Sequence, residues 1–582
     1  MLRLHKLSSE PACYEPIEFR SGVNLILGER SDPVDSQGRK VNGVGKSLSV
    51  EFLHFALCRQ YHDTRVSRIP KGVLPDNIVV ILDLTIGDTR LQIRRSIANP
   101  AQPTVVGADG AETVFENLDD VNRYLGSLLF EDQEHAGQVT FRQVTSLLMR
   151  DERSGFKDYL NPHDVKKKIP TDIAPHLYLL GIDTSCHRQL SDTIKKLDSL
   201  RISLKELKAT VTNGNERKLS DIPSILNEEQ QVAKKIEEAL STLRADPAFE
   251  EVESELNEIE ASLTRLRGER KKLNFQIDQI RSIPLPERID AADLKIVYER
   301  IKAGLGELVE KSLDQAREFK AEIERFQQTL RQDELKTLEA RRREISSKIR
   351  QLSDNHSELA RHIDRNGVLK EITTGLEVAN RRTDEYHRLA SQFQMYEEKA
   401  AEVEDSKTER SNNLNALVQE LANEKDREQS FNDTIVSYHK KIQGTSRASF
   451  RFNVNTKPNV KRPLTFDVRV QDDGSHSIDQ VRVFLYDFAL MFNEFSRRHH
   501  PRFLVHDNVL EVDQDTLTNC LNFVHDKSES EDDFQYILTL NRDKIEGEES
   551  RDAIRLDINA VKRASFTKTD QFLRKRYQES EK

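Results

Sequence analysis

The chain of 582 residues contains no tryptophan, and aromatic residues make up only 6% of it. Charged residues, by contrast, make up 32% of the sequence. This composition is too polar for a single large globular core, and it is typical of chains that carry long, solvated helices. A chain of this length is also expected to contain more than one domain.

Cysteine is scarce as well, and the four cysteines lie far apart, at Cys13, Cys58, Cys186 and Cys520. No Cys-x-x-Cys pair occurs, so the spacing argues against a zinc ribbon or a zinc hook contributed by this chain. Free thiols in a reducing compartment are the simpler interpretation.

Long apolar runs are also missing. We find no apolar run near the eighteen residues of a membrane-spanning helix, and the N-terminus has no apolar signal core. The sequence therefore predicts a soluble, cytoplasmic protein with no membrane segment. Its net charge of −10 gives no overall signal for nucleic-acid binding, although a local basic face is compatible with it.

Two regions with mixed α/β patterns enclose a long helical region. In residues 1–180 we expect a buried strand at 23–29, a helix at 46–60 and two strands within 77–97 that meet at a Gly-Asp turn. Leu48, Phe52 and Phe55 should face inward from the helix. In residues 443–582 the pattern predicts strands at 450–454, 464–470, 502–507 and 535–541, and an apolar helix at 478–495.

The intervening residues, 181–442, repeat apolar side chains at alternating steps of four and three. This heptad pattern predicts a coiled coil. One long amphipathic surface helix would explain one such segment, but not three segments in the same frame. The pattern breaks near 282–310, where we expect the chain to turn and the two arms to pair antiparallel. The repeat includes Ile259, Leu263, Leu266, Leu273, Ile277, Leu338, Ile345, Ile349 and Leu352.

The motif that carries chemistry follows the first predicted strand. A strict P-loop has glycine five positions before the glycine of Gly-Lys-Ser, and here that position is Lys40. Gly28-Glu29 and the later run "NGVGKS" nevertheless resemble the loop Gly-Glu-Asn-Gly-x-Gly-Lys-Ser that is common in SMC-like proteins, here separated by the twelve residues 30–41. Two interpretations follow: an interrupted P-loop with an inserted surface loop, or a glycine-rich turn that ends in Gly-Lys-Ser.

An interrupted P-loop would assemble its phosphate cradle at a helix N-terminus, where backbone N–H groups bind anions. Lys46 would reach the β- and γ-phosphates of ATP, and Ser47 would bind Mg²⁺. The residues of this ATP-binding loop would be Asn42, Gly43, Val44, Gly45, Lys46 and Ser47.

A second acidic motif lies far downstream. The stretch "RFLVHDN" is an apolar strand that ends in Asp507, and a carboxylate there suits a Mg²⁺ site in phosphoryl transfer. Asp507 and Ser47 would then hold the same ion.

This layout resembles the SMC-like ABC ATPases, in which the P-loop lies in the first half of the head and the acidic strand in the second. The resemblance implies an α/β ABC-type P-loop ATPase head formed from an N-terminal lobe (1–180) and a C-terminal lobe (443–582). The lobes would be joined by a long antiparallel coiled coil (181–442). It also implies ATP and Mg²⁺ as ligands, and two heads that sandwich ATP.

The resemblance implies further site residues. The signature segment falls at "GSHSIDQ", where Ser475 or Ser477 would contact the γ-phosphate bound to a second head. The double glycine of that signature is absent, so an ordinary helix-capping turn is the alternative. Gln143 is the candidate for the glutamine that approaches Mg²⁺.

The chain departs from the family directly after the acidic strand. These ATPases usually have a glutamate there as the base that polarises water, whereas this chain has Asn508. An amide cannot accept the proton, although it can position water. Glu511 and Asp513 are the nearby candidates to replace that base. Asn541 stands where the family often has a switch histidine.

One bacterial branch is the most similar: the ATPase subunit of three-component ABC systems, which is associated with anti-phage defence. The points of resemblance are segments 124–130 and 141–156, the apolar helix, and "LVHDN". They imply that ATP turnover is coupled to sensing of DNA or foreign nucleic acid. They also imply one or two partner subunits, including a separate effector.

Two other functions remain open from the sequence. Asn508 is compatible with a hydrolysis-poor scaffold that is gated by ATP. A DNA-repair ATPase of the RecN or SbcC type is the other alternative, although the missing Cys-x-x-Cys hook argues against the latter.

Overall fold

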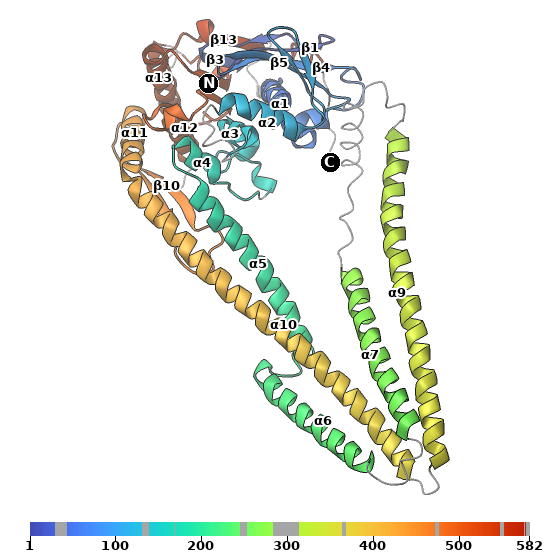
Figure 1. Cartoon of the computed structure of the whole chain (residues 1–582). Coiled ribbons are helices and arrows are strands. Elements are labelled where there is room, and N and C mark those ends of the chain that lie inside the picture. The colour runs from blue at the N-terminus through green and yellow to red at the C-terminus, as the bar shows by residue number, and fades with distance from the viewer. Residues whose placement is uncertain are drawn as a thin grey trace. The chain divides into compact units, whose positions relative to one another are not determined.

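The structure is a computed structural model that describes residues 1–29, 43–130, 139–167, 169–244, 253–282, 313–363, 368–471, 476–547, 552–575 and 577. These residues form two compact units (Figure 1). The first takes the described residues of Met1–Asp192 and Ser411–Lys582, and the second takes those between Thr193 and Arg410. The inserted residues 30–41, Asn42, Ser475 and the predicted turn beyond Ser282 lie outside the described residues.

A five-stranded parallel sheet in the first unit brings the two ends of the chain together. Its order is β13-β3-β12-β11-β8, and each neighbouring pair is parallel. The N-terminal part supplies β3 and β8, and the C-terminal part supplies the other three. The strands are β3 (Gly22–Gly28), β8 (Met149–Arg150), β11 (Phe503–Asp507), β12 (Gln535–Asn541) and β13 (Lys562–Phe566).

The three central strands match the predicted strands at 23–29, 502–507 and 535–541, which are thereby confirmed. Every residue of β11 and β12 is buried, and so are all but the first of β3. A parallel sheet covered on both faces requires such continuous apolar runs, which is why the sequence reveals them.

A second sheet of six antiparallel strands lies in the same unit, in the order β2-β1-β4-β5-β6-β7. The two strands predicted within 77–97 are its β4 and β5, with register partners Ile86 and Thr89 at the turn. The strands are β1 (Leu2–Glu10), β2 (Ile17–Glu18), β4 (Val79–Ile86), β5 (Thr89–Ser96), β6 (Thr104–Gly107) and β7 (Glu112–Val114).

Helix α1 (Lys46–Ala56) packs between the two sheets. Leu48, Phe52 and Phe55 are buried as predicted, in one apolar cluster with residues of both sheets. The helix ends four residues before the predicted Gln60. Cys58 adopts a left-handed φ of 62°, and the buried Arg95 donates a 2.7 Å hydrogen bond to the carbonyl of Arg59, so the chain turns away there.

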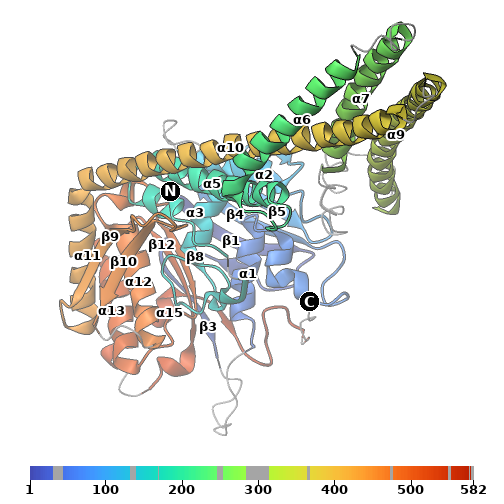
Figure 2. The ribbon, with the colours of Figure 1, turned by 90° about the horizontal axis from the view of Figure 1, so that it is seen from below.

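The other face of the parallel sheet is covered by the apolar helix predicted at 478–495 (Figure 2). It is α12 (His476–Phe492), and its Phe488 ring packs 4.9 Å from that of Tyr536 in β12. The strands predicted at 450–454 and 464–470 are present as β9 (Ala448–Val454) and β10 (Leu464–Val470), which pair antiparallel. Other α-helices that the structure describes in this unit are α2 (Leu118–Leu129), α3 (Phe141–Leu148), α4 (Ala174–Leu179), α11 (Lys425–Gln443), α13 (Gln514–Ser530) and α15 (Ile558–Val561).

Long helices fill the middle of the chain. In the second unit, α7 and α9 flank the predicted turn and pack against each other through heptad residues, with Leu263, Leu273, Ile345 and Ile349 buried. Among the helices described, even the longest are too polar to be candidate membrane spans. These helices are α5 (Ser185–Val211), α6 (Ile222–Arg244), α7 (Glu253–Ser282), α9 (Leu313–Ile363) and α10 (Val368–Asn423).

A buried ionic network ties α12 to the parallel sheet. Arg150 of β8 donates two hydrogen bonds to Asp487 of α12, one of them 2.8 Å long, and both side chains are fully buried. His506 of β11 contacts the same carboxylate at 2.9 Å through Nε2. The network thus joins the residue just before Asp507 to the helix that follows the signature-like segment.

Asp487→Ala should destabilise the protein by about 3–5 kcal/mol, because it leaves the buried Arg150 cation without its partner. Denaturant melting of the purified chain measures this. The matched control is Asp467→Ala, whose partner Arg469 is 2.9 Å away but whose ion pair is exposed. The control should change stability by less than about 1 kcal/mol. Equal effects of the two variants would contradict the assigned role of the network.

Candidate functional site

The loop before α1 is shaped by two glycines. Gly45 has a left-handed φ of 108°, and a Cβ atom on it would lie 2.6 Å from the Cβ of Phe572. A Cβ atom on Gly28, at the end of β3, would lie 3.0 Å from Cδ of Lys46. Glycine is therefore required at position 45 for the loop to close, and at position 28 it leaves room for the lysine side chain along the strand end.

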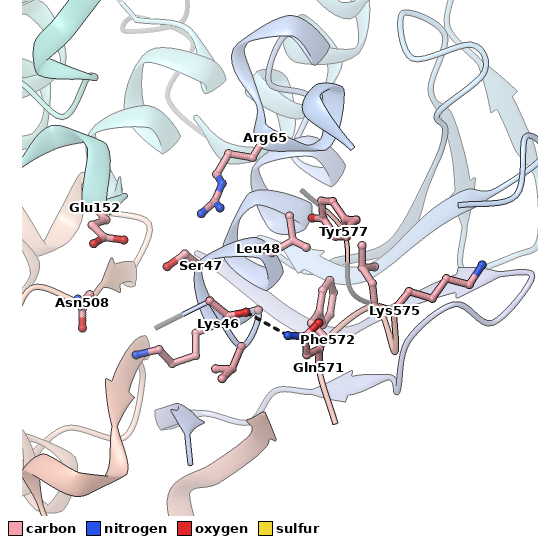
Figure 3. A pocket seen from close by; sticks show the side chains of 14 residues that line it. Lys46, Ser47, Leu48, Arg65, Glu152, Asn508, Gln571, Phe572, Lys575 and Tyr577 are labelled. Carbon is pink, nitrogen blue, oxygen red and sulfur yellow. Dashed lines mark hydrogen bonds between the residues drawn. The ribbon is translucent and has the colours of Figure 1, made fainter. Parts of the chain in front are cut away.

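The N-terminus of α1 opens onto a pocket of about 480 Å³ (Figure 3). Gly45 caps this helix without a side chain, and the first turn carries no acidic residue. Its first N–H groups therefore face the pocket side without a side-chain partner, which favours an anion. Gly43, Val44, Gly45, Lys46 and Ser47 all line the pocket.

Lys46 is 7% exposed, and its Nζ donates a hydrogen bond to Oδ1 of Asn541 at the end of β12. Burial lowers the pKa of Lys46, although the carboxylates of Asp507, Glu152 and Glu511 oppose the shift. A bound anion would stabilise the charged form of Lys46 and so raise its pKa again.

Asp507 accepts two hydrogen bonds on one oxygen, from Ser47 Oγ at 3.0 Å and from Thr539 Oγ1 at 2.7 Å. Ser47 and Asp507 are 460 positions apart in the sequence, and the parallel sheet brings them together. Asp507 is 1% exposed, and burial raises its pKa against the effect of these hydrogen bonds. A cation beside it would stabilise the ionised form.

Asn508 follows Asp507 with a left-handed φ of 67° and lines the pocket. Its Nδ2 donates a 2.7 Å hydrogen bond to Oε1 of Glu511. Asp513, the other sequence candidate for the missing base, caps α13 by accepting from the backbone N–H of Thr516 at 3.0 Å. Its carboxylate is therefore engaged in holding that helix.

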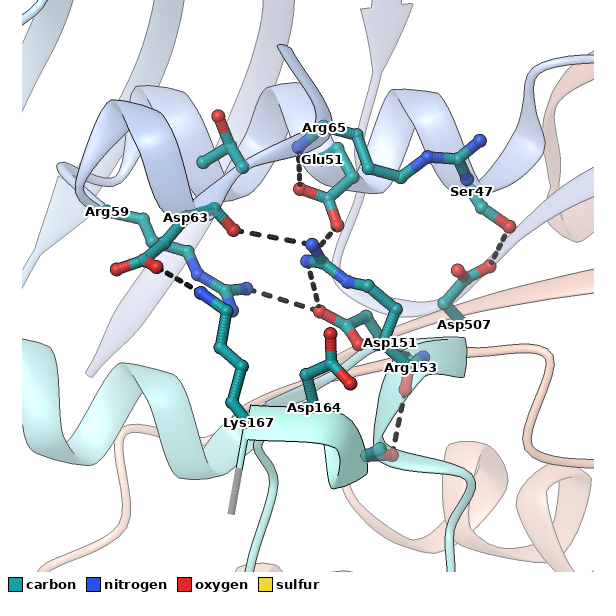
Figure 4. Close-up of polar contacts among 12 residues, drawn as sticks. Ser47, Glu51, Arg59, Asp63, Arg65, Asp151, Arg153, Asp164, Lys167 and Asp507 are labelled. Carbon is teal, nitrogen blue, oxygen red and sulfur yellow. Dashed lines mark hydrogen bonds and ion pairs between the residues drawn. The ribbon is translucent and has the colours of Figure 1, made fainter. Parts of the chain in front are cut away.

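The segment after β8 lies beside the same strand end and is fixed by ion pairs (Figure 4). Arg153 bonds both Glu51 of α1 and Asp151, and Arg59 bonds Asp151 at 3.2 Å. Between the two anchored residues stands Glu152, which lines the pocket together with Ser47 and Asn508.

The far side of the pocket is made by residues near the end of the chain, which we call the C-terminal wall: Gln571, Phe572, Leu573, Lys575 and Tyr577. The backbone N–H of Phe572 donates to the carbonyl of Val44 at 3.3 Å. Its ring stacks on Tyr14 at a centroid distance of 4.5 Å and meets Phe52 edge-on. The wall is thus bound to the loop before α1.

Comparisons with known proteins give limited matches. The profile of a bacterial family described as an uncharacterised conserved protein (DUF2326) matches residues 437–577, which include Asp507 and the C-terminal wall. A solved structure, the Smc head domain with a coiled coil and joint derived from Pyrococcus yayanosii, is 16% identical, with 95% of this chain and 94% of that chain covered. The TM-score is 0.33, which is too low to identify a fold. No curated protein matches the chain.

The structure brings most of the sequence candidates together. Gly43 to Ser47 and Asn508 line the pocket, Asp507 contacts Ser47, and Glu511 contacts Asn508. Ser477 lies in the first turn of α12 and is not among the residues that line this pocket.

Gln143 corrects the sequence interpretation. It forms the capping box of α3 with Thr140, and its Nε2 donates a 2.7 Å hydrogen bond to Asp172. It does not line the pocket with Lys46 and Ser47. Within segment 141–156, the residue that reaches the pocket is Glu152. Strand β8 lies between Gln143 and Glu152 and brings the chain to the edge of the sheet.

Sequence reasoning also missed Thr539, Arg65 and the C-terminal wall. Thr539 lies inside a strand predicted only for its apolar character, and Arg65 lines the pocket from a short 3-10 helix after α1. A signal for the wall existed in the aromatic residues of "FLRKRY", which stand out in a chain so poor in aromatics.

Proposed function

We propose that this chain is an SMC-like ABC ATPase whose first unit binds and hydrolyses Mg²⁺·ATP at the N-terminus of α1. The observation that carries the proposal is the hydrogen bond from Ser47 to Asp507, beside the buried Lys46 and at the edge of the pocket. A glycine loop, a lysine, a hydroxyl and a buried carboxylate at one helix N-terminus form the set that nucleoside triphosphates require.

The residues present fit Mg²⁺. The ion prefers oxygen ligands, and the Ser47 hydroxyl and Asp507 carboxylate would hold it. When bound, Mg²⁺ supplies positive charge against the charge that develops on the phosphate oxygens. Gln143 is left out of this ligand set because of its place in the capping box of α3.

The protein's own groups would bind and orient the phosphates. The first N–H groups of α1 would bind phosphate oxygens, and Lys46 would add a charge-assisted hydrogen bond. Asn541 holds the lysine in place at the strand end. The test is phosphate release from ATP by the purified chain, which should require Mg²⁺; a chain that neither binds nor hydrolyses ATP would refute the proposal.

The C-terminal wall should recognise the nucleoside, because it lies at the end of the pocket away from Asn508 and Glu152 (Figure 3). Tyr577→Ala should weaken ATP binding by roughly 10-fold, as expected for loss of one base–aromatic contact. Binding of inorganic tripolyphosphate should not change. Arg574→Ala is the control, since Arg574 pairs with Glu15 and does not line the pocket. Equal losses for both ligands would contradict this assignment.

The proposal extends to assembly and signalling, supported by the family resemblance of the sequence. Two heads would pair across ATP, with the Ser475–Ser477 segment of one facing the phosphate site of the other. ATP turnover would report DNA or foreign nucleic acid to one or two partner subunits, including an effector. Light scattering with and without ATP, and recovery of the native complex with its subunits, test these steps.

A second candidate function is a hydrolysis-poor scaffold gated by ATP. It is favoured by Asn508, an amide that is engaged with Glu511 at the position next to Asp507. Measuring ATP turnover with and without DNA separates the two, because a scaffold would bind ATP tightly and remain slow in both conditions.

A further inference from the structure

Two neighbouring strands end beside the pocket, and a carboxylate that follows one of them lines the pocket together with Asn508. Strand β8 pairs in parallel with β11, with Met149 beside Val505 and Arg150 beside His506. The pairing ends there: Asp151 and the short 3-10 helix that begins at Glu152 follow β8, and β11 ends at Asp507. Because the two strands are parallel, both segments leave the sheet at the same edge, where Glu152 and Asn508 line the pocket.

The other carboxylates around the pocket are committed to partners. Asp151 binds Arg59 and Arg153, and Glu51 binds Arg153 and the backbone N–H of Arg65. Asp507 accepts from Ser47 and Thr539, and Glu511 accepts from Asn508.

Glu152 differs from them, because its carboxylate has no hydrogen bond or ion pair within the described part of the chain. It is exposed, and it lines both the main pocket and a smaller one beside Ser47 and Asp507. Figure 3 shows it next to Asn508 at the Ser47 end of the pocket.

The backbone of Glu152 is nevertheless held firmly. Its neighbours Asp151 and Arg153 form ion pairs with each other and with α1, and the segment forms a short helical turn in which Ser154 Oγ donates to the carbonyl of Asp151 at 2.8 Å. A free carboxylate on a fixed backbone can act on a bound ligand at little cost in entropy. An ordinary surface glutamate would lack both the anchoring and the pocket.

We propose that Glu152 is the general base for ATP hydrolysis, in place of the carboxylate that Asn508 cannot provide; the proposal rests on the ATPase function inferred above. In this step Glu152 accepts a proton from water as the water oxygen forms a bond to the γ-phosphorus. The bond between the γ-phosphorus and the bridging oxygen breaks, and ADP leaves with that electron pair. The proton then passes from Glu152 to solvent. Asn508 Oδ1 is placed to accept the second water hydrogen.

The test is single-turnover hydrolysis by Glu152→Gln, with ATP affinity measured in parallel. Loss of a positioned base should lower the rate by about 10²–10⁴-fold. ATP affinity should stay within about threefold of wild type, because the glutamine keeps the size of the side chain. Glu152→Asp should recover part of the rate. Because the Glu152 side chain is exposed, both substitutions should leave the melting temperature unchanged, and melting curves check this directly.

Glu511→Gln tests the rival base, because Glu511 accepts the hydrogen bond from Asn508. The matched control is Glu18→Gln, at an exposed glutamate of β2 that does not line the pocket, and its rate should remain within about threefold of wild type. Retained hydrolysis in Glu152→Gln overturns the proposal, and loss in Glu511→Gln alone assigns the base to Glu511 instead. A wild-type chain that binds no ATP overturns the ATPase function as well, whereas one that binds and hydrolyses ATP irrespective of Glu152 overturns only the assignment of the base.

Discussion

Lys46→Ala should weaken ATP binding by at least roughly 100-fold, equivalent to about 3 kcal/mol. The side chain is 7% exposed, extends past Gly28 and carries the charge nearest the helix N-terminus that would bind phosphate. In such a desolvated place a charge-assisted hydrogen bond is stronger than one in water. Titration with a fluorescent ATP analogue measures the change.

The control for this prediction is Lys544→Ala. Lys544 is close enough to affect the pKa of Lys46, yet it does not line the pocket. Its removal changes the net charge equally and should alter ATP affinity by less than about threefold. If Lys46→Ala bound ATP as tightly as this control, the loop before α1 would not be the phosphate site.

Asp507→Asn should abolish most Mg²⁺-dependent hydrolysis while making the ligand-free protein more stable. Loss of residues that merely support metal ligands costs about 10–100-fold, so loss of a direct ligand should cost at least about 100-fold. The amide oxygen can still accept the hydrogen bonds from Ser47 and Thr539. The buried negative charge, however, is removed.

The difference in stability between Asp507→Asn and wild type should depend on pH. Burial raises the pKa of Asp507 above its unfolded value, so ionisation of this group opposes folding. At low pH, where the carboxyl is protonated in both states, variant and wild type should melt alike. As pH rises through the folded-state pKa of Asp507, the melting temperature of wild type should fall below that of the variant. Added Mg²⁺ should reduce the difference between the two melting temperatures. A variant that melts lower than wild type at high pH without Mg²⁺ would contradict the prediction.

The sequence predicts the centre of the first unit well, because buried parallel strands appear in it as apolar runs. β3, β11 and β12 coincide with the predicted apolar runs, and α1 begins at Lys46, directly after Gly45. The edge strands escape prediction. β8 has only two residues, and β13, "KRASF", is mostly polar.

The site is predictable only in part for a related reason. Lys46, Ser47 and Asp507 stand at strand or helix ends that the pattern reveals. Glu152 reaches the pocket because it follows the unpredicted β8, which pairs with β11, and no local signal reports that pairing. The misplacement of Gln143 has the same cause, since it lies in the first turn of α3, the short helix that leads into that strand.

The central claim is that Lys46, Ser47 and Asp507 form one nucleotide site, and an experimental structure with Mg²⁺ and a non-hydrolysable ATP analogue tests it most directly. The account predicts density for the β- and γ-phosphates at the N-terminus of α1, with the ion between Ser47 and Asp507 and the base against the C-terminal wall. Nucleotide density elsewhere, such as in the larger cavity beside Arg142, or an empty pocket at saturating analogue, would contradict it.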